Sequence, residues 1–132
     1  MGVRFMKRQR EETIKVWFEM WRSDDITPMH ALFTDDVVYT ECWGNQYMGK
    51  EEIDKWFEDW HKNNRMNVWD VKRFIHAEDK TIVEWHMEAL SMNGTTRWMD
   101  GVYVIEWDEG SEQIKSLREY GASNRMTRPY GK

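Results

Sequence analysis

The spacing of apolar residues changes along the chain, and this change restricts the folds that the chain can form. Two segments carry four apolar side chains at the i, i+3, i+4, i+7 spacing of one helix face: Ile14, Trp17, Phe18 and Trp21, and then Ile53, Trp56, Phe57 and Trp60. The spacing predicts an amphipathic helix over about residues 4–22 and another that begins at Lys50. Towards the C-terminus the period becomes two, which is the period of a β-strand.

This alternation predicts four strands in the second half of the chain, near residues 67–76, 81–92, 96–107 and 112–121. The connections between them are short and polar, and one contains Asn93-Gly94, a dipeptide typical of hairpin turns. We therefore expect neighbouring strands in this half to be antiparallel.

The segment between the two long helices predicts smaller elements. Thr27 and Pro28 form an N-cap and first-position pair for a short helix that ends at Asp35-Asp36. A strand is predicted over residues 37–43 and a turn region over residues 44–49. Because a helix and a sheet each bury one apolar side, the early helices must cover one face of a curved sheet, which predicts an α+β fold.

Charge and composition exclude several classes of function. The net charge of -5 argues against binding to nucleic-acid phosphates, and the basic cluster Arg4, Lys7, Arg8 and Arg10 is expected to be the solvated first part of a helix. No segment reaches the roughly 18 apolar residues of a membrane span, and Cys42 is the only cysteine. We expect a soluble cytoplasmic protein with no nucleic-acid partner, no membrane partner and no cofactor.

Several segments together resemble a known family. They are "ALFTDDVVYTECWG", "GKEEIDKWFEDWH", "DGVYVIEWDEGSEQIKSLREYGA" and a terminal "PYG". In this order and spacing they resemble the nuclear transport factor 2-like superfamily, and most of all its SnoaL-like proteins of unknown activity. The resemblance implies a cone-shaped α+β roll, in which a curved antiparallel or mixed sheet wraps around the N-terminal helices. It also implies a single SnoaL-like domain over residues 1–132, of which residues 122–132 form a tail.

Glu41 supports two interpretations. By pattern it is a carboxylate that ends a strand, whereas the resemblance to ketosteroid isomerases places it where that family has its carboxylate general base. Burial among Trp and Met side chains would raise its pKa towards the working range of an acid-base catalyst. Tyr103 stands where that family has a protonated aspartate, and it could donate a hydrogen bond to an oxyanion.

The strand over residues 81–92 has a charged face and an apolar face: Glu84, His86 and Glu88, and Val83, Trp85, Met87 and Ala89. By pattern alone the charged face points to water. The resemblance to limonene epoxide hydrolase implies the opposite, because Glu84 and His86 match inward residues of its site and Glu119 matches its second aspartate. Trp85 would then face a partner subunit. The charged face could also bind a divalent metal, but no second histidine lies near it in sequence, and we expect no metal.

The tryptophans are either core residues or the wall of a ligand site. Five of them are candidates for an aromatic wall: Trp17, Trp21, Trp43, Trp56 and Trp60. The main hypothesis is a small-molecule site for an apolar ligand, in which Glu41 and Glu119 transfer protons and Glu84, His86 and Tyr103 assist. The alternatives are a module that binds a ligand without changing it and a dimeric association domain with a filled core.

The resemblance also implies a homodimer that pairs through the convex face of the sheet. Trp85, Trp98, Val102 and Val104 would supply an apolar patch there. The sequence names neither a substrate nor a reaction, and whether the protein is an enzyme stays open.

Overall fold

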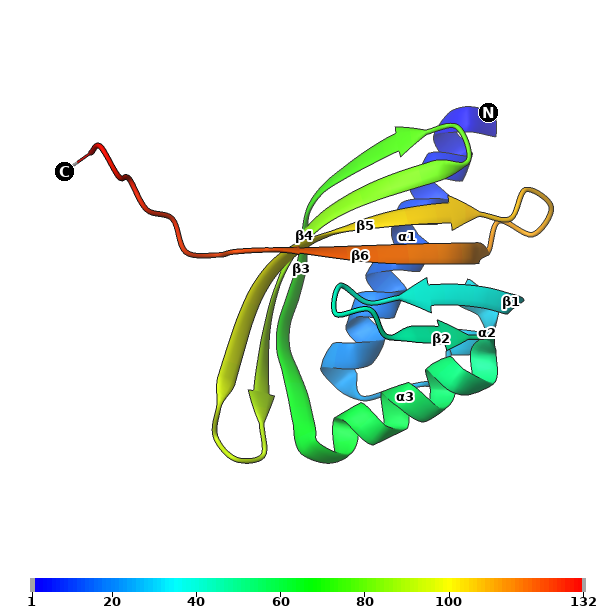
Figure 1. Cartoon of the computed structure of the whole chain (residues 1–132). Helices are drawn as coiled ribbons and strands as arrows, with labels where there is room; N and C mark the ends of the chain where they lie inside the picture. The colour runs from blue at the N-terminus through cyan, green and yellow to red at the C-terminus, as the bar shows by residue number, and fades with distance from the viewer. Residues whose placement is uncertain (1, 132) are drawn as a thin grey trace.

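The structure is a computed structural model, and it describes residues 2–131. In chain order its elements are α1 (Gly2–Ser23), α2 (Met29–Leu32), β1 (Phe33–Thr40), β2 (Gln46–Met48), α3 (Lys50–Asn63), β3 (Asn64–Ala77), β4 (Lys80–Ser91), β5 (Thr96–Trp107) and β6 (Ile114–Ala122). Figure 1 shows the strands curving around α1, with α3 at one end beside β1 and β2. The chain after β6 runs away from the body (Figure 1). None of the described helices is long and apolar enough to cross a membrane.

One six-stranded sheet carries all the strands, in the order β2-β1-β6-β5-β4-β3. The predicted antiparallel run from β3 to β6 is confirmed. The sheet is nevertheless mixed, because β1 pairs with β6 in parallel. This pairing places a strand from the first third of the chain next to the last strand, and it is the feature that assembles the site described below.

The elements before α3 differ from the prediction in three ways. The short helix ends at Leu32, and Asp35 and Asp36 lie inside β1, not at a helix end. A shift in the β1–β6 register between Phe33 and Val38 lets both aspartates face solvent while Phe33 stays buried. Pro28, not Thr27, is the N-cap of α2.

The third difference is in the turn region predicted over residues 44–49. It contains β2, which pairs with the end of β1 through Tyr39↔Tyr47. A strand of three residues shows too little alternation to be seen in the sequence.

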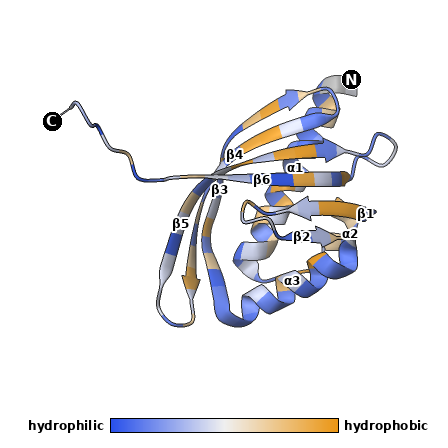
Figure 2. Ribbon diagram, viewed as in Figure 1, coloured by the Kyte–Doolittle hydropathy of each residue, from blue (hydrophilic) through white to orange (hydrophobic). Residues whose placement is uncertain are grey.

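Aromatic rings fill the space between the helices and the sheet. Trp17 meets Trp21 and Phe33 edge to face, at 5.4 and 4.9 Å between ring centroids. Phe18 stacks on Trp69 of β3 at 4.3 Å. Figure 2 shows the result as hydrophobic and hydrophilic bands that alternate along the strands. The aromatic face of α1 predicted from the sequence is therefore the centre of the core.

Arg10 does not lie in water as expected for the basic cluster. Only 5% of it is exposed, and its guanidinium pairs with Glu112 at 2.8 Å and donates to the carbonyl oxygen of Glu78 at 2.6 Å. It also lies over the ring of Trp107, at 5.4 Å. Arg10 therefore ties α1 to the two turns that join β3 to β4 and β5 to β6.

Candidate functional site

A cavity lies between α1, α3 and the concave side of the sheet. We call it the inner cavity; its volume is about 40 Å³, and it is lined by Trp21, Tyr39, Glu41, Trp43, Trp56, Trp60, Met66, Trp69, Met87, Arg97, Met99 and Glu119. The wall thus consists of aromatic rings and thioethers, interrupted by two carboxylates and one arginine. The cavity can hold a water molecule, which needs about 10–15 Å³, but it is far smaller than the roughly 300 Å³ of a site for a whole drug-sized ligand.

The parallel pairing of β1 and β6 brings the two carboxylates of the wall together. Thr40, the last residue of β1, is the register partner of Arg118, so Glu41, which directly follows β1, lies next to Glu119 of β6. The chain turns back immediately after β1, where the amide of Gly44 donates to the carbonyl of Glu41 at 2.9 Å. Glu41 is thereby held at the cavity and is not extended into water.

Both carboxyl groups have perturbed proton affinities. Burial raises the pKa of Glu41, even though the hydroxyl of Tyr47 donates to its Oε1 at 2.7 Å. Burial also raises the pKa of Glu119, and the charge of Glu41 adds to this rise. The amide of Cys42 donates to Oε2 of Glu119 at 3.3 Å. The two acids therefore titrate closer to neutral pH than free glutamate does.

A pair of buried phenols lies beside the acids. The hydroxyl oxygens of Tyr39 and Tyr103 are 2.5 Å apart, and both residues are fully buried. Burial raises the pKa of both phenols well above its ordinary value, so both keep their protons. If Tyr103 donates to Tyr39, the proton of Tyr39 is free to point at the inner cavity, which Tyr39 lines.

Two tryptophans of the wall carry unused hydrogen-bond donors. Within residues 2–131, the buried indole N–H groups of Trp21 and Trp69 meet no acceptor. A buried donor without a partner costs free energy. Both N–H groups are enclosed by protein atoms, although the two rings line the cavity.

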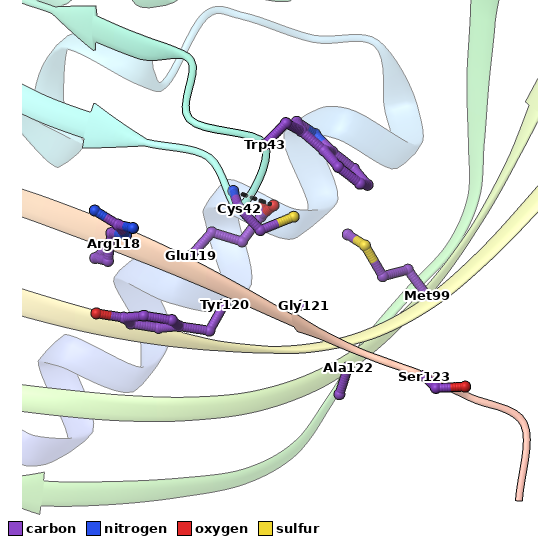
Figure 3. A pocket seen from close by; sticks show the side chains of 9 residues that line it. All are labelled: Cys42, Trp43, Met99, Arg118, Glu119, Tyr120, Gly121, Ala122 and Ser123. Atoms are coloured by element: carbon purple, nitrogen blue, oxygen red, sulfur yellow. Dashed lines mark hydrogen bonds between the residues drawn. The ribbon is translucent and has the colours of Figure 1, made fainter.

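A surface depression adjoins the inner cavity, and we call it the outer groove. Its volume is about 470 Å³, and it runs along the end of β6 from Arg118 to Ser123. Figure 3 shows Trp43, Cys42 and Met99 on one side of this strand, with the Glu119 side chain among them. Trp43, Met99 and Glu119 line both spaces, so these three residues form the boundary between them. Burial raises the pKa of the Cys42 thiol to about 12, which makes it a poor nucleophile.

Comparison with known proteins identifies the family. The model of the SnoaL-like domain matches residues 14–115, which is most of the chain. The chain belongs to the SnoaL-like family. A comparison with curated proteins found no match.

Solved structures with the same fold have distant sequences. A ketosteroid isomerase-like protein from Catenulispora acidiphila, solved with trimethylamine, is 18% identical with a TM-score of 0.73, over 83% of this chain and 84% of its own. A nuclear transport factor 2-like protein from Burkholderia xenovorans is 15% identical with a TM-score of 0.73, over 94% of this chain and 91% of its own. An epoxide hydrolase from Mycobacterium tuberculosis is 14% identical with a TM-score of 0.75, over 87% of this chain and 84% of its own. At such identities the similarity shows the fold alone, which is the nuclear transport factor 2-like α+β fold expected from the sequence.

Two residues predicted for the site of this SnoaL-like domain lie elsewhere. Glu84 and His86 are on the outer face of β4, where Arg73 pairs with Glu84. The inward orientation implied by limonene epoxide hydrolase is wrong for this chain, because Trp85 points inward and its ring lies over Gly101, the only residue type without a Cβ. Trp85 therefore cannot face a partner subunit.

His86 belongs to a charged network on that outer face. Its Nδ1 lies 2.7 Å from Asp100 and its Nε2 lies 2.9 Å from Glu88. Hydrogen bonds to Glu88 and Asp100 raise the pKa of the His86 ring. Within residues 2–131 no group of three or more His, Cys, Asp or Glu side chains is arranged to hold a metal ion.

The remaining predicted residues divide between the wall and the core. Trp21, Trp43, Trp56 and Trp60 line the inner cavity, together with Glu41 and Glu119. Trp17 is a core residue, and Tyr103 lies behind Tyr39, outside the wall. Sequence reasoning missed Tyr39, Trp69 and Arg97. The signal for Tyr39 was its position two residues before Glu41, which places both side chains on the same side of one strand.

Proposed function

We propose that the inner cavity binds a reactive part of a small organic molecule and that Glu41 and Glu119 transfer protons on it. The observation that carries the proposal is that two carboxyl groups with raised pKa line one aromatic cavity. Acid-base catalysis works best when the pKa of the catalytic group lies near the working pH, and burial moves both groups in that direction. The mutual repulsion of the two acids favours a state in which one holds a proton and the other does not.

Such a pair can move a proton along a substrate without a cofactor. The ionised glutamate takes a proton from a carbon next to a carbonyl group; the electron pair of the C–H bond forms a C=C bond, and the π pair of the carbonyl group moves onto its oxygen. The protonated glutamate then returns a proton to another atom of the substrate, which restores the number of protons. Tyr39, which lines the cavity, supplies a hydroxyl donor for the oxygen that gains charge. An isomerase, a cyclase or a hydrolase could use this chemistry.

The size of the two spaces restricts how a substrate would lie. The inner cavity, at about 40 Å³, admits only a small head group, whereas the outer groove, at about 470 Å³, has room for a larger body. Because Trp43, Met99 and Glu119 belong to both, we propose that the substrate crosses between them at these residues. Trp43 is the candidate for a gate, since it is 55% exposed on the turn after β1 while Met99 and Glu119 are buried.

The similar structures support a small-molecule role. The Catenulispora acidiphila protein was solved in complex with trimethylamine, and the Mycobacterium tuberculosis protein is an epoxide hydrolase. Proteins of this fold can therefore hold small organic compounds and act on them. A dimeric association domain with a filled core, in contrast, would have no inner cavity.

Matched glutamine variants test the proposal. Glu41→Gln and Glu119→Gln keep the shape of the side chain, and each should lower turnover at least about a hundredfold without changing the far-ultraviolet circular dichroism. Glu106→Gln, on the outer face of β5, is the control and should be fully active. The assay is solvent-deuterium exchange into carbonyl compounds that quench tryptophan fluorescence, followed by mass spectrometry. A ligand recovered unaltered and without deuterium would favour the binding module, and an active Glu41→Gln variant would remove Glu41 from the mechanism.

A homodimer through the outer face of the sheet is part of the proposal, on a smaller apolar patch than the sequence implied. Trp85 is not in this patch, because it points inward. Trp98 is 57% exposed on β5, and Val102 and Val104 are half-buried on the same face. Trp98→Lys should convert the dimer to a monomer in multi-angle light scattering, and an unchanged mass would show that this patch does not pair.

A further inference from the structure

The wall of the inner cavity has the chemistry that recognises a positive charge. We infer that the head group bound there is a small organic ammonium ion. The inference names the ligand class of the proposed site, and so it rests on that proposal for the place of binding. It is tested by binding alone, without any turnover.

The first argument is the arrangement of the aromatic rings. Trp21 stands at 4.8 Å and 56° to Trp56, at 5.1 Å and 73° to Trp60, and at 5.9 Å and 76° to Trp69. These rings pack edge to face or tilted against one another, and Tyr39 continues the cluster at 5.0 Å from Trp56. All five rings line the inner cavity, and aromatic walls attract cations such as methylated ammonium groups through the negative faces of the rings.

The second argument is the charge on the wall. Glu41 and Glu119 are its acids, and among residues 2–131 Arg97 is the only basic residue that lines it. Arg97 is exposed, and its guanidinium lies 5.2 Å from the ring of Trp43, so its charge sits at the mouth and not inside. With one acid of the pair ionised, an anionic ligand would place a second negative charge beside a buried carboxylate, and a neutral apolar ligand would leave that carboxylate without a counter-charge. A cation offsets its charge, which is how buried charges are normally stabilised.

The third argument is the contrast between the two spaces. The outer groove shares Trp43, Met99 and Glu119 with the inner cavity but adds Arg118 and Ser123, whereas the inner cavity adds Glu41 and further aromatic rings. A ligand that spans both would therefore place its ammonium group inside and its uncharged or polar body outside. Arg97, stacked on Trp43 at the boundary, already shows a cation on the face of a ring of this wall.

The experiment compares two molecules of the same shape. Choline carries a quaternary nitrogen where its neutral analogue, 3,3-dimethylbutan-1-ol, carries a carbon. Both are titrated into the full chain at about pH 8, where carboxylates ionise, with tryptophan fluorescence and calorimetry as readouts. Equal additions of sodium chloride control for ionic strength. We expect choline to bind at least tenfold more tightly than the alcohol.

Variants link the preference to the wall. Glu119→Gln should lower the affinity for choline at least tenfold and leave that for the alcohol unchanged, whereas Glu106→Gln should change neither. Trp60→Leu, in a half-buried position on α3, is the second variant, and it should lower the affinity for choline more than the affinity for the alcohol. Circular dichroism verifies that each variant folds.

The outcomes separate the two proposals. Equal affinity for choline and the alcohol would overturn the ammonium inference but leave a small-molecule cavity in place. A preference for choline that survives both Glu119→Gln and Trp60→Leu would place the cation elsewhere and would also overturn it. Binding of neither probe overturns it as well, while the deuterium-exchange assay with the Glu41→Gln variant still decides whether the acids transfer protons.

Discussion

Replacing Gly101 with alanine tests how closely β5 packs on the ring of Trp85. A Cβ atom at position 101 would lie 2.5 Å from Cη2 and 2.8 Å from Cε2 of that ring. Carbon atoms in contact are separated by about 3.5–4.0 Å, so the ring or the strand must move by about 1 Å. Trp85 has no exposed surface, and its ring centroid lies 5.4 Å from Tyr103, so the ring cannot move without disturbing its neighbours.

The expected cost follows from the lack of free space. Overpacking a core costs about 1–3 kcal/mol, and a rigid, fully buried ring places this site near the upper end. For a chain of 132 residues, a loss of about 3 kcal/mol corresponds to a fall in Tm of roughly 10 °C. The assay is thermal unfolding followed by circular dichroism, with urea unfolding as a second measure of the free energy.

A matched glycine on the next strand provides the control. Gly121 is the register partner of Gly101, but it is exposed. A Cβ atom added at position 121 would meet the sulfur of Cys42 first, at 3.3 Å. Gly121→Ala should therefore change stability by less than about 0.5 kcal/mol. Combining Gly101→Ala with Trp85→Phe should cost less than the sum of the two single changes, because the smaller ring makes room. Unchanged stability of Gly101→Ala would refute the inward position of Trp85 and, with it, the assignment of Glu84 and His86 to the outer face.

Three further predictions concern charged groups. Because burial raises the pKa of Glu119, its ionisation destabilises the fold as pH rises from 4.5 through the folded pKa, so Glu119→Gln should raise Tm at pH 7 but not at about pH 4. The raised pKa of His86 acts in the same direction at higher pH: its stabilisation is complete below 6.5 and is lost as pH rises through the folded pKa, so His86→Gln should flatten the dependence of Tm on pH in that range. Arg10→Met removes one partner of the ion pair with Glu112, which is still partly exposed. The free energy of unfolding should therefore fall by about 2 kcal/mol, less than the 3–5 kcal/mol lost when a fully buried pair is broken. Arg8→Met, on the exposed side of α1, should cost less than about 0.5 kcal/mol.

The long helices and the antiparallel run of strands could be predicted because each has a clear apolar period over ten or more residues. The aromatic spacing around Trp17 and Trp56 indicated the helix faces correctly. Glu41 and Glu119 could be proposed as a pair only through the family resemblance, because no local pattern reports a parallel pairing between distant strands.

The orientation of β4 shows where a pattern and a resemblance give opposite answers. Alternation alone placed Glu84 and His86 outside, and the structure agrees with it. The resemblance to limonene epoxide hydrolase reversed the two faces. The deciding fact is the space that Trp85 needs opposite Gly101, and this contact between two strands is invisible when each strand is read by itself.

The parallel pairing of β1 with β6 also determines when the site can form during synthesis. The hydrogen bond from Cys42 to Glu119 spans 77 residues of sequence, so the two acids meet only after residue 119 has left the ribosome. Until then one edge of β1 has no partner strand, and pairings of such long range form slowly. The nascent chain therefore exposes this edge together with a cluster of aromatic residues. Exposed strand edges and hydrophobic surface promote aggregation, so chaperones are most needed in the interval before β6 emerges.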